Sequence, residues 1–171
     1  MSFRSTPLRA TMALAAVALL AGCDTNNGGG TLRDLAGTYA FVELRFVPAA
    51  SAIAPADVLS LLDPDLTRVE VDSEGRAFFF LREQSTSTTR IAETAVTATA
   101  SRATFRAITA PDVDAMLRYL LPSVLQLSHD GGVTVLNGEP TLRVNLQAFD
   151  PQAYQGLTDV AGTLFVRLER R

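Results

Sequence analysis

The chain of 171 residues contains one cysteine, one histidine, no tryptophan and no lysine. A single cysteine cannot form a disulfide within the chain, and a chain without a histidine pair or a cysteine pair lacks the usual zinc ligand sets. We therefore expect no metal site and no cofactor. The stability of the folded domain must then come from the packing of its core.

Catalytic motifs are also missing. His129 is the only histidine, and its Ser-His-Asp-Gly context predicts an exposed turn, with no G-x-S-x-G motif nearby. The nearest carboxylate pairs are Glu70 with Asp72 and Asp112 with Asp114. A solvent-facing strand explains the first pair, and the positive end of a helix explains the second. No glycine-rich loop of the phosphate-binding type joins a strand to a helix. The sequence predicts that the protein is not an enzyme.

An apolar run near the start of the chain predicts a secretory signal. Arg4 and Arg9 precede the run Met12–Leu20, which is followed by Ala-Gly-Cys. About nine apolar residues fit the core of a signal peptide and fall short of the roughly 20 that span a bilayer. We therefore expect residues 1–22 to be removed from the mature protein.

The residues around the expected cleavage site resemble the lipobox of bacterial lipoproteins. Ala21 and Gly22 are small enough for a narrow peptidase site, and the thiol of Cys23 can form a thioether to diacylglycerol. The resemblance implies lipidation of Cys23 and attachment to a membrane through acyl chains such as palmitate, with the domain in the periplasm or on the cell surface. Asp24 resembles the inner-membrane retention signal of enteric bacteria, and the choice between the inner and outer membranes stays open.

Three segments are expected: the signal peptide 1–22, the acylated cysteine with a flexible tether 23–30, and one domain over 31–171. The tether is predicted because residues 24–30 contain no apolar side chain and end in three glycines. After cleavage, thirteen arginines face eighteen acidic residues, which leaves a net charge of −5 with the histidine neutral. An acidic domain argues against a nucleic-acid partner.

From Thr31 onward, short segments of alternating polarity are separated by turn residues. This pattern predicts an all-β fold, an antiparallel up-and-down barrel of about eight or nine strands. Asn137-Gly138 and an earlier Asp-Gly-Gly predict that residues 124–149 form a three-stranded meander. The expected strands are 39–47, 67–72, 76–83, 88–100, 102–108, 124–129, 133–136, 141–149 and 162–170.

Two helices are expected among the strands, over residues 55–62 and 111–121, and each begins with a proline. The second carries an apolar stripe at three- and four-residue spacing. Such a stripe suits a helix that closes a barrel end or covers a sheet face, and it also suits a movable lid over a ligand cavity. The stripe consists of Val113, Met116, Leu117 and Leu120.

The two ends of the expected domain resemble those of bacterial lipocalin-like domains. The segment 35–39, Leu-Ala-Gly-Thr-Tyr, has a Gly-x-aromatic at the start of the first strand, and residues 162–170 form a closing strand. Tyr39 stands where lipocalins carry tryptophan. The resemblance implies a closed barrel with a ligand pocket. The alternative is a half-open barrel with helices beneath it, similar to lipoprotein carriers of the Gram-negative envelope.

The expected function is to bind or carry a small apolar ligand close to a membrane. The alternative is a structural or adaptor lipoprotein with a filled barrel that contacts another envelope protein, and the oligomeric state stays open. Phe79 and Leu81 are expected to face inward, because arginines share the opposite face of their strand. The candidate ligand-binding residues are Phe79, Leu81, Leu142, Val144, Leu146, Leu164, Val166, Leu168, Met116 and Leu120.

Overall fold

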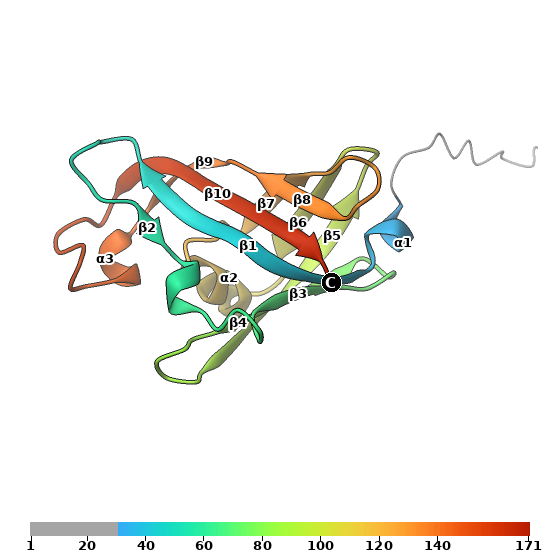
Figure 1. The fold of residues 1–171 in the computed structure, drawn as a ribbon, viewed down its shortest axis with the longest axis horizontal. Helices are drawn as coiled ribbons and strands as arrows, with labels where there is room; N and C mark the ends of the chain where they lie inside the picture. The colour runs from blue at the N-terminus through green and yellow to red at the C-terminus, as the bar shows by residue number, and fades with distance from the viewer. Residues whose placement is uncertain (1–30) are drawn as a thin grey trace, which may run out of the picture.

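The computed structural model describes residues 31–171, so the expected signal peptide, Cys23 and the tether lie outside the described residues. Eight antiparallel strands close into a barrel, and a few short helices cover its ends (Figure 1). The fold class predicted from the sequence is confirmed. The elements are α1 (Leu32–Leu35), β1 (Gly37–Pro48), β2 (Ala56–Asp57), η1 (Leu59–Leu61), β3 (Arg68–Val71), β4 (Arg76–Arg82), β5 (Thr89–Ala98), β6 (Arg102–Ala107), α2 (Ala110–Leu117), β7 (Val124–Ser128), β8 (Val135–Gly138), β9 (Thr141–Val144), α3 (Leu146–Phe149) and β10 (Val160–Arg170).

Neighbouring strands in the barrel follow one another along the chain, in the order β1-β3-β4-β5-β6-β7-β8-β10. The last strand returns to the first, and their pairing runs from Tyr39 opposite Arg170 to Pro48 opposite Gly162. This long seam pairs the edges of β1 and β10 that an open sheet would expose. The half-open alternative is therefore wrong, because β1 and β10 pair over most of their lengths.

Alternation along each strand sends one set of side chains into the barrel. On β4, Phe79 and Leu81 are fully buried, whereas Phe78 and Phe80 are half-buried on the outer face. The expected orientation of this strand is confirmed. Inside, the ring of Phe79 meets that of Phe105 edge to face at 5.6 Å between centroids, a favourable aromatic geometry.

The α1 end of the barrel is held by hydrogen bonds and by a cation over an aromatic ring. The Tyr39 hydroxyl donates to the carbonyl oxygens of Leu35 (2.7 Å) and Val133 (3.2 Å). The guanidinium of Arg170 lies 5.6 Å from the centroid of the Tyr39 ring and donates to the carbonyl of Ala36. The first and last residues of the barrel therefore lock together at this end.

Helix α2 closes the opposite end. A capping box starts it: the Thr109 hydroxyl accepts from the Asp112 N–H, and the Asp112 side chain accepts from the Thr109 N–H. Met116 is fully buried, as are Tyr119, Leu120 and Leu121 after the helix. The helix ends at Leu117 and not at Leu121 as expected, because Leu120 adopts a φ of 61° that turns the chain towards β7.

The helix expected over residues 55–62 does not form. Instead, Ala56 pairs with Phe46 as part of β2, and the N–H of Val58 donates to the carbonyl of Leu44 at 2.9 Å. A single 3-10 turn, η1, follows. The exposed half of β1 offers backbone partners to this segment, and pairing with them outweighs its local helical preference.

The predicted meander over residues 124–149 is only partly correct. No hairpin turn forms at the Asn-Gly pair, since β8 and β9 lie end to end on the same edge of β10, with Gly138 opposite Val166 and Thr141 opposite Thr163. A Cβ atom at Gly138 would lie 2.7 Å from the backbone oxygen of Gln126 on β7. Glycine is therefore needed here for a close approach between strands.

The strand expected over residues 141–149 ends at Val144. Asn145 then caps the short helix α3, because its side-chain oxygen accepts from the N–H of Ala148 at 2.8 Å. Leu146 and Phe149 of α3 turn inward and are buried. The cap and the burial of these two side chains together replace the strand that the alternating pattern predicts.

Candidate functional site

A groove lies where the barrel wall is least tightly paired. Strand β7 pairs with β8 only at Ser128 and Asn137. Beyond this point β9 runs on beside the end of α2, and a cavity of about 420 Å³ opens between α2, β9 and α3. We call this cavity the end groove. It is lined by Asp114, Leu117, Arg118, Leu120, Arg143, Val144, Asn145 and Ala148.

The apolar side of the end groove comes largely from the last turn of α2. Leu117 is 52% exposed, which is unusual for a leucine beside a packed core. Leu120 is buried and has the positive φ given above, a conformation that costs a residue other than glycine about 1–2 kcal/mol. The N–H of Leu121 donates to the carbonyl of Met116 at 3.1 Å and helps to hold this turn.

Two arginines line the polar side of the end groove. Arg143 forms a bidentate ion pair with Asp159 at 2.6 and 2.7 Å, and this hydrogen bonding lowers the pKa of Asp159 below its usual value. Arg118 donates to the carbonyl oxygens of Ala148 (2.6 Å) and Phe149 (2.9 Å). These contacts tie the end of α2 to the last carbonyls of α3.

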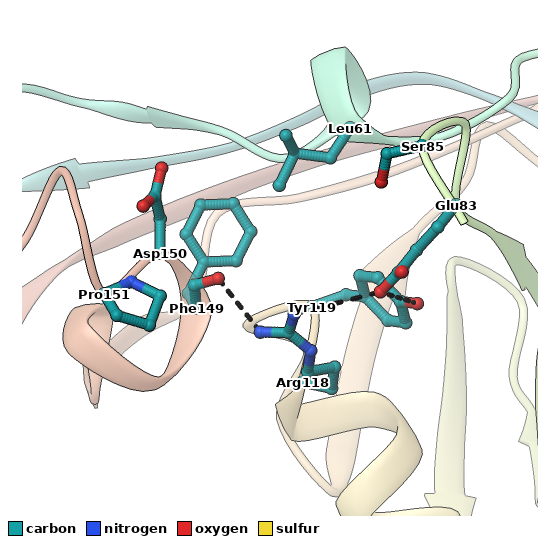
Figure 2. A pocket seen from close by; sticks show the side chains of 8 residues that line it. All are labelled: Leu61, Glu83, Ser85, Arg118, Tyr119, Phe149, Asp150 and Pro151. Carbon is teal, nitrogen blue, oxygen red and sulfur yellow. Dashed lines mark hydrogen bonds and ion pairs between the residues drawn. The ribbon is translucent and has the colours of Figure 1, made fainter. Parts of the chain in front are cut away.

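Arg118 also lines a second, smaller cavity of about 200 Å³ (Figure 2). On its wall, the hydroxyl of Tyr119 donates to Glu83 at 3.0 Å. Burial, together with the hydrogen bond and the charge of Glu83, raises the pKa of Tyr119 to about 12. Glu83 also accepts from the Thr86 hydroxyl at 2.7 Å. This polar cluster fixes the β4–β5 turn to the end of α2.

The single histidine has a structural role. His129 is only 8% exposed, so the expectation of an exposed turn residue is wrong. The N–H of Gly131 donates to its Nδ1 at 3.2 Å, which leaves the proton on Nε2 to donate to the carbonyl of Thr99 at 3.1 Å. Both ring nitrogens are therefore used to hold adjacent turns together.

Within residues 31–171, no group of three or more histidine, cysteine, aspartate or glutamate side chains is placed to hold a metal ion. Over the same range, no helix combines the length and the apolar character needed to cross a membrane.

The structure separates the candidate ligand-binding residues into different places. Leu120 and Val144 line the end groove. Leu142 is half-buried on β9 and packs against the core. The remaining candidates are buried core side chains, namely Phe79, Leu81, Met116, Leu146, Leu164, Val166 and Leu168.

Of the eight residues that line the end groove, the sequence predicted only Leu120 and Val144 as binding residues; the six that it missed are Asp114, Leu117, Arg118, Arg143, Asn145 and Ala148. The sequence signal that could have indicated this groove is the expected helix over 111–121, which begins with a proline, together with the later apolar segment over 141–149. The arginines themselves carry no local signal, because they reach the groove only through the tertiary packing of α2, β9 and α3.

No protein-family model, curated protein or solved structure matches this chain.

Proposed function

We propose that this protein is a lipid-anchored lipoprotein of the bacterial cell envelope, with a lipocalin-like barrel that serves as an adaptor. In this proposal Cys23 carries the acyl chains, and the end groove contacts another envelope protein. One observation carries the adaptor role. The axis of the barrel is filled by the protein's own side chains.

The filled axis argues against a ligand inside the barrel. Tyr39 and Phe46 of β1, Phe79 of β4 and Phe105 of β6 are fully buried and occupy the interior. An eight-stranded barrel has room either for its own side chains or for one small ligand. A ligand at the axis would have to displace several of these aromatic rings. Binding is therefore expected on the surface, where the end groove is the largest apolar recess described above.

The position of the chain entry supports a protein partner. The described domain begins beside α1 and the end groove lies beside α3, and these two helices are at opposite ends of the barrel (Figure 1). If the chain is anchored at Cys23, a tether of residues 24–30 spans roughly 15 Å. The groove end would then face away from the membrane and towards other envelope proteins.

A second candidate function is the binding of a small apolar ligand in the end groove. The volume of about 420 Å³ favours it, because ligand pockets commonly measure roughly 300–1,000 Å³. Native mass spectrometry of the protein, purified without detergent, would test this candidate. A co-purifying small molecule that is lost in a Leu117→Glu variant would support it, and a clean mass over repeated preparations would count against it.

Two measurements in the native host test the proposed function. Labelled palmitate should enter the wild-type chain but not a Cys23→Ser variant. A photo-crosslinking amino acid at position 117 should give one discrete adduct with an envelope protein. The same amino acid at Val42, which is 45% exposed on β1 and lies outside the groove, should give none. Unlabelled wild-type protein would refute the anchor, and equal crosslinking at both positions would refute the adaptor site.

A further inference from the structure

Strand β9 has a free edge that faces the end groove. Among residues 31–171 it pairs only with β10. The N–H of Leu164 donates to the carbonyl of Pro140 at 3.0 Å. Backbone groups on an antiparallel strand point alternately towards and away from the partner strand. The backbone N–H and C=O groups of Leu142 and Val144 therefore point towards β10. The N–H and C=O groups of Thr141 and Arg143 therefore point away from β10.

The free edge and the apolar recess lie side by side. Arg143 and Val144 of β9 line the end groove together with Leu117 and Leu120. A strand added to β9 would place alternate side chains on the inner side of the sheet. The exposed Leu117 supplies an apolar surface for such a side chain.

We propose that the end groove binds an extended segment of a partner protein, which joins the free edge of β9 as an additional strand. Backbone hydrogen bonds to Thr141 and Arg143 would hold the segment, and its central apolar side chain would pack against Leu117 and Leu120. This inference rests on the adaptor function proposed above and names the kind of partner that the site fits.

Charge complementarity favours a segment with acidic residues. Two guanidinium groups, those of Arg118 and Arg143, line the groove with the carboxylate of Asp114; Arg143 also pairs with Asp159, and Arg118 lies 3.9 Å from Glu83. Asp159 accepts from Nε and Nη2 of Arg143, so among the described residues the Nη1 of Arg143 is the nitrogen left to donate to a second carboxylate. A carboxylate directly across from Arg143 would form a favourable cross-strand pair.

The same charge argues against a second copy of this chain as the occupant. Antiparallel pairing of β9 with β9 would bring Arg143 close to Arg143 of the other copy, and like charges opposite one another are destabilising. The chain's own N-terminal segment joins the described domain at Thr31, at the other end of the barrel (Figure 1).

A synthetic peptide tests strand addition directly. The probe is acetyl-Glu-Val-Thr-Leu-Thr-Val-Glu-amide, which alternates apolar and polar side chains and is acidic at both ends. The peptide is titrated into a ¹⁵N-labelled protein that begins at residue 23 and carries Cys23→Ser. Removal of residues 1–22 should leave the fold intact, because residues 31–171 enclose a core of their own. We expect binding at millimolar concentration or below, with the largest amide shifts at Thr141 and Arg143.

Two N-methylated versions of the peptide serve as controls, each blocked on one set of alternate amides. A strand uses only one set to pair with β9, so one version should bind at least about fivefold more weakly, and the other should bind like the parent. Equal binding by both versions would overturn strand addition. Failure of the parent peptide to bind at millimolar concentration would also overturn it.

Variants at one position give an independent test. Arg143→Pro removes an N–H that points away from β10, so it removes no hydrogen bond between β9 and β10. Arg143→Ala removes the same side chain and ion pair but keeps this N–H. The proline variant should bind the peptide at least about fivefold more weakly than the alanine variant, with the other amide signals unchanged. Equal affinities would refute the assigned hydrogen bond.

Substitution in the groove avoids any effect on β9. Leu117→Glu should abolish peptide binding, whereas Leu66→Glu, at another exposed leucine, should not change it. If peptide binding fails in every arm but crosslinking at position 117 succeeds, strand addition is wrong and the adaptor function stands. Loss of both refutes both proposals.

Discussion

Replacing Phe79 by alanine would show whether the barrel is filled by its own side chains. Phe79 is fully buried on β4 and touches aromatic rings on two other strands: Phe105 at 5.6 Å and Phe41 at 6.3 Å between centroids. If these rings form a packed core, removal of the Phe79 ring should lower the free energy of unfolding strongly. If the interior were a preformed ligand cavity, the loss would be mild.

Three contributions set the expected cost. Loss of the buried apolar surface contributes about 2 kcal/mol. The residual cavity contributes roughly 1–2 kcal/mol at about 24 cal/mol per Å³. Loss of the aromatic contacts adds about 0.5–1 kcal/mol. The Phe79→Ala variant should therefore be destabilised by about 4 kcal/mol, which corresponds to a fall in Tm of roughly 10–15 °C for a domain of this size.

The neighbouring Phe80 provides a matched control. It points outward on the same strand, half-buried, with the guanidinium of Arg68 over its ring at 4.1 Å from the centroid. Phe80→Ala should cost only about 1 kcal/mol. Urea unfolding followed by circular dichroism measures both variants. A difference below about 1 kcal/mol between them would refute the filled barrel and, with it, the main support for the adaptor function.

Two further predictions concern barrel closure and pH. In Gly162→Ala the new Cβ would overlap the backbone oxygen of Val47, so urea unfolding should show a free energy of unfolding that is about 3 kcal/mol lower. Gly156→Ala is the control, because only a positive φ opposes alanine there, and its free energy of unfolding should fall by about 1 kcal/mol. Equal losses in the two variants would contradict the close approach between Gly162 and β1. The raised pKa of Tyr119, about 12, means that its contribution to stability is fully present below the unfolded value of about 10 and is lost as pH rises towards 12. Alkaline unfolding of Tyr119→Phe, which cannot donate to Glu83, should therefore be less steep in this window, and an unchanged profile would contradict the assignment.

Local patterns were sufficient for the strands whose alternation is unambiguous. Phe79 and Leu81 face inward as expected, because arginines on the same strand can only be solvated on the outer face. Where a residue had two possible roles, local patterns failed. Gly138 suits a turn, but it is needed for close contact with β7.

The end groove could not be predicted for a related reason. Asn145 starts a helix only because α3 can bury Leu146 and Phe149 against the barrel. Arg118 reaches the carbonyls of α3 across 30 residues of sequence. Both features depend on contacts between distant segments, which a local pattern does not encode.

The sequence alone determined the all-β class and the inward set of side chains on the clearly alternating strands, because alternation at a period of two specifies the buried face of each strand. It left open whether the barrel closes, and the pairing of β1 with β10 decided this. Only the tertiary structure decided that the barrel is filled and that β9 keeps a free edge beside α2. Whether a barrel is hollow depends on how side chains from many strands meet at its axis, and this follows from the three-dimensional register and not from any one segment.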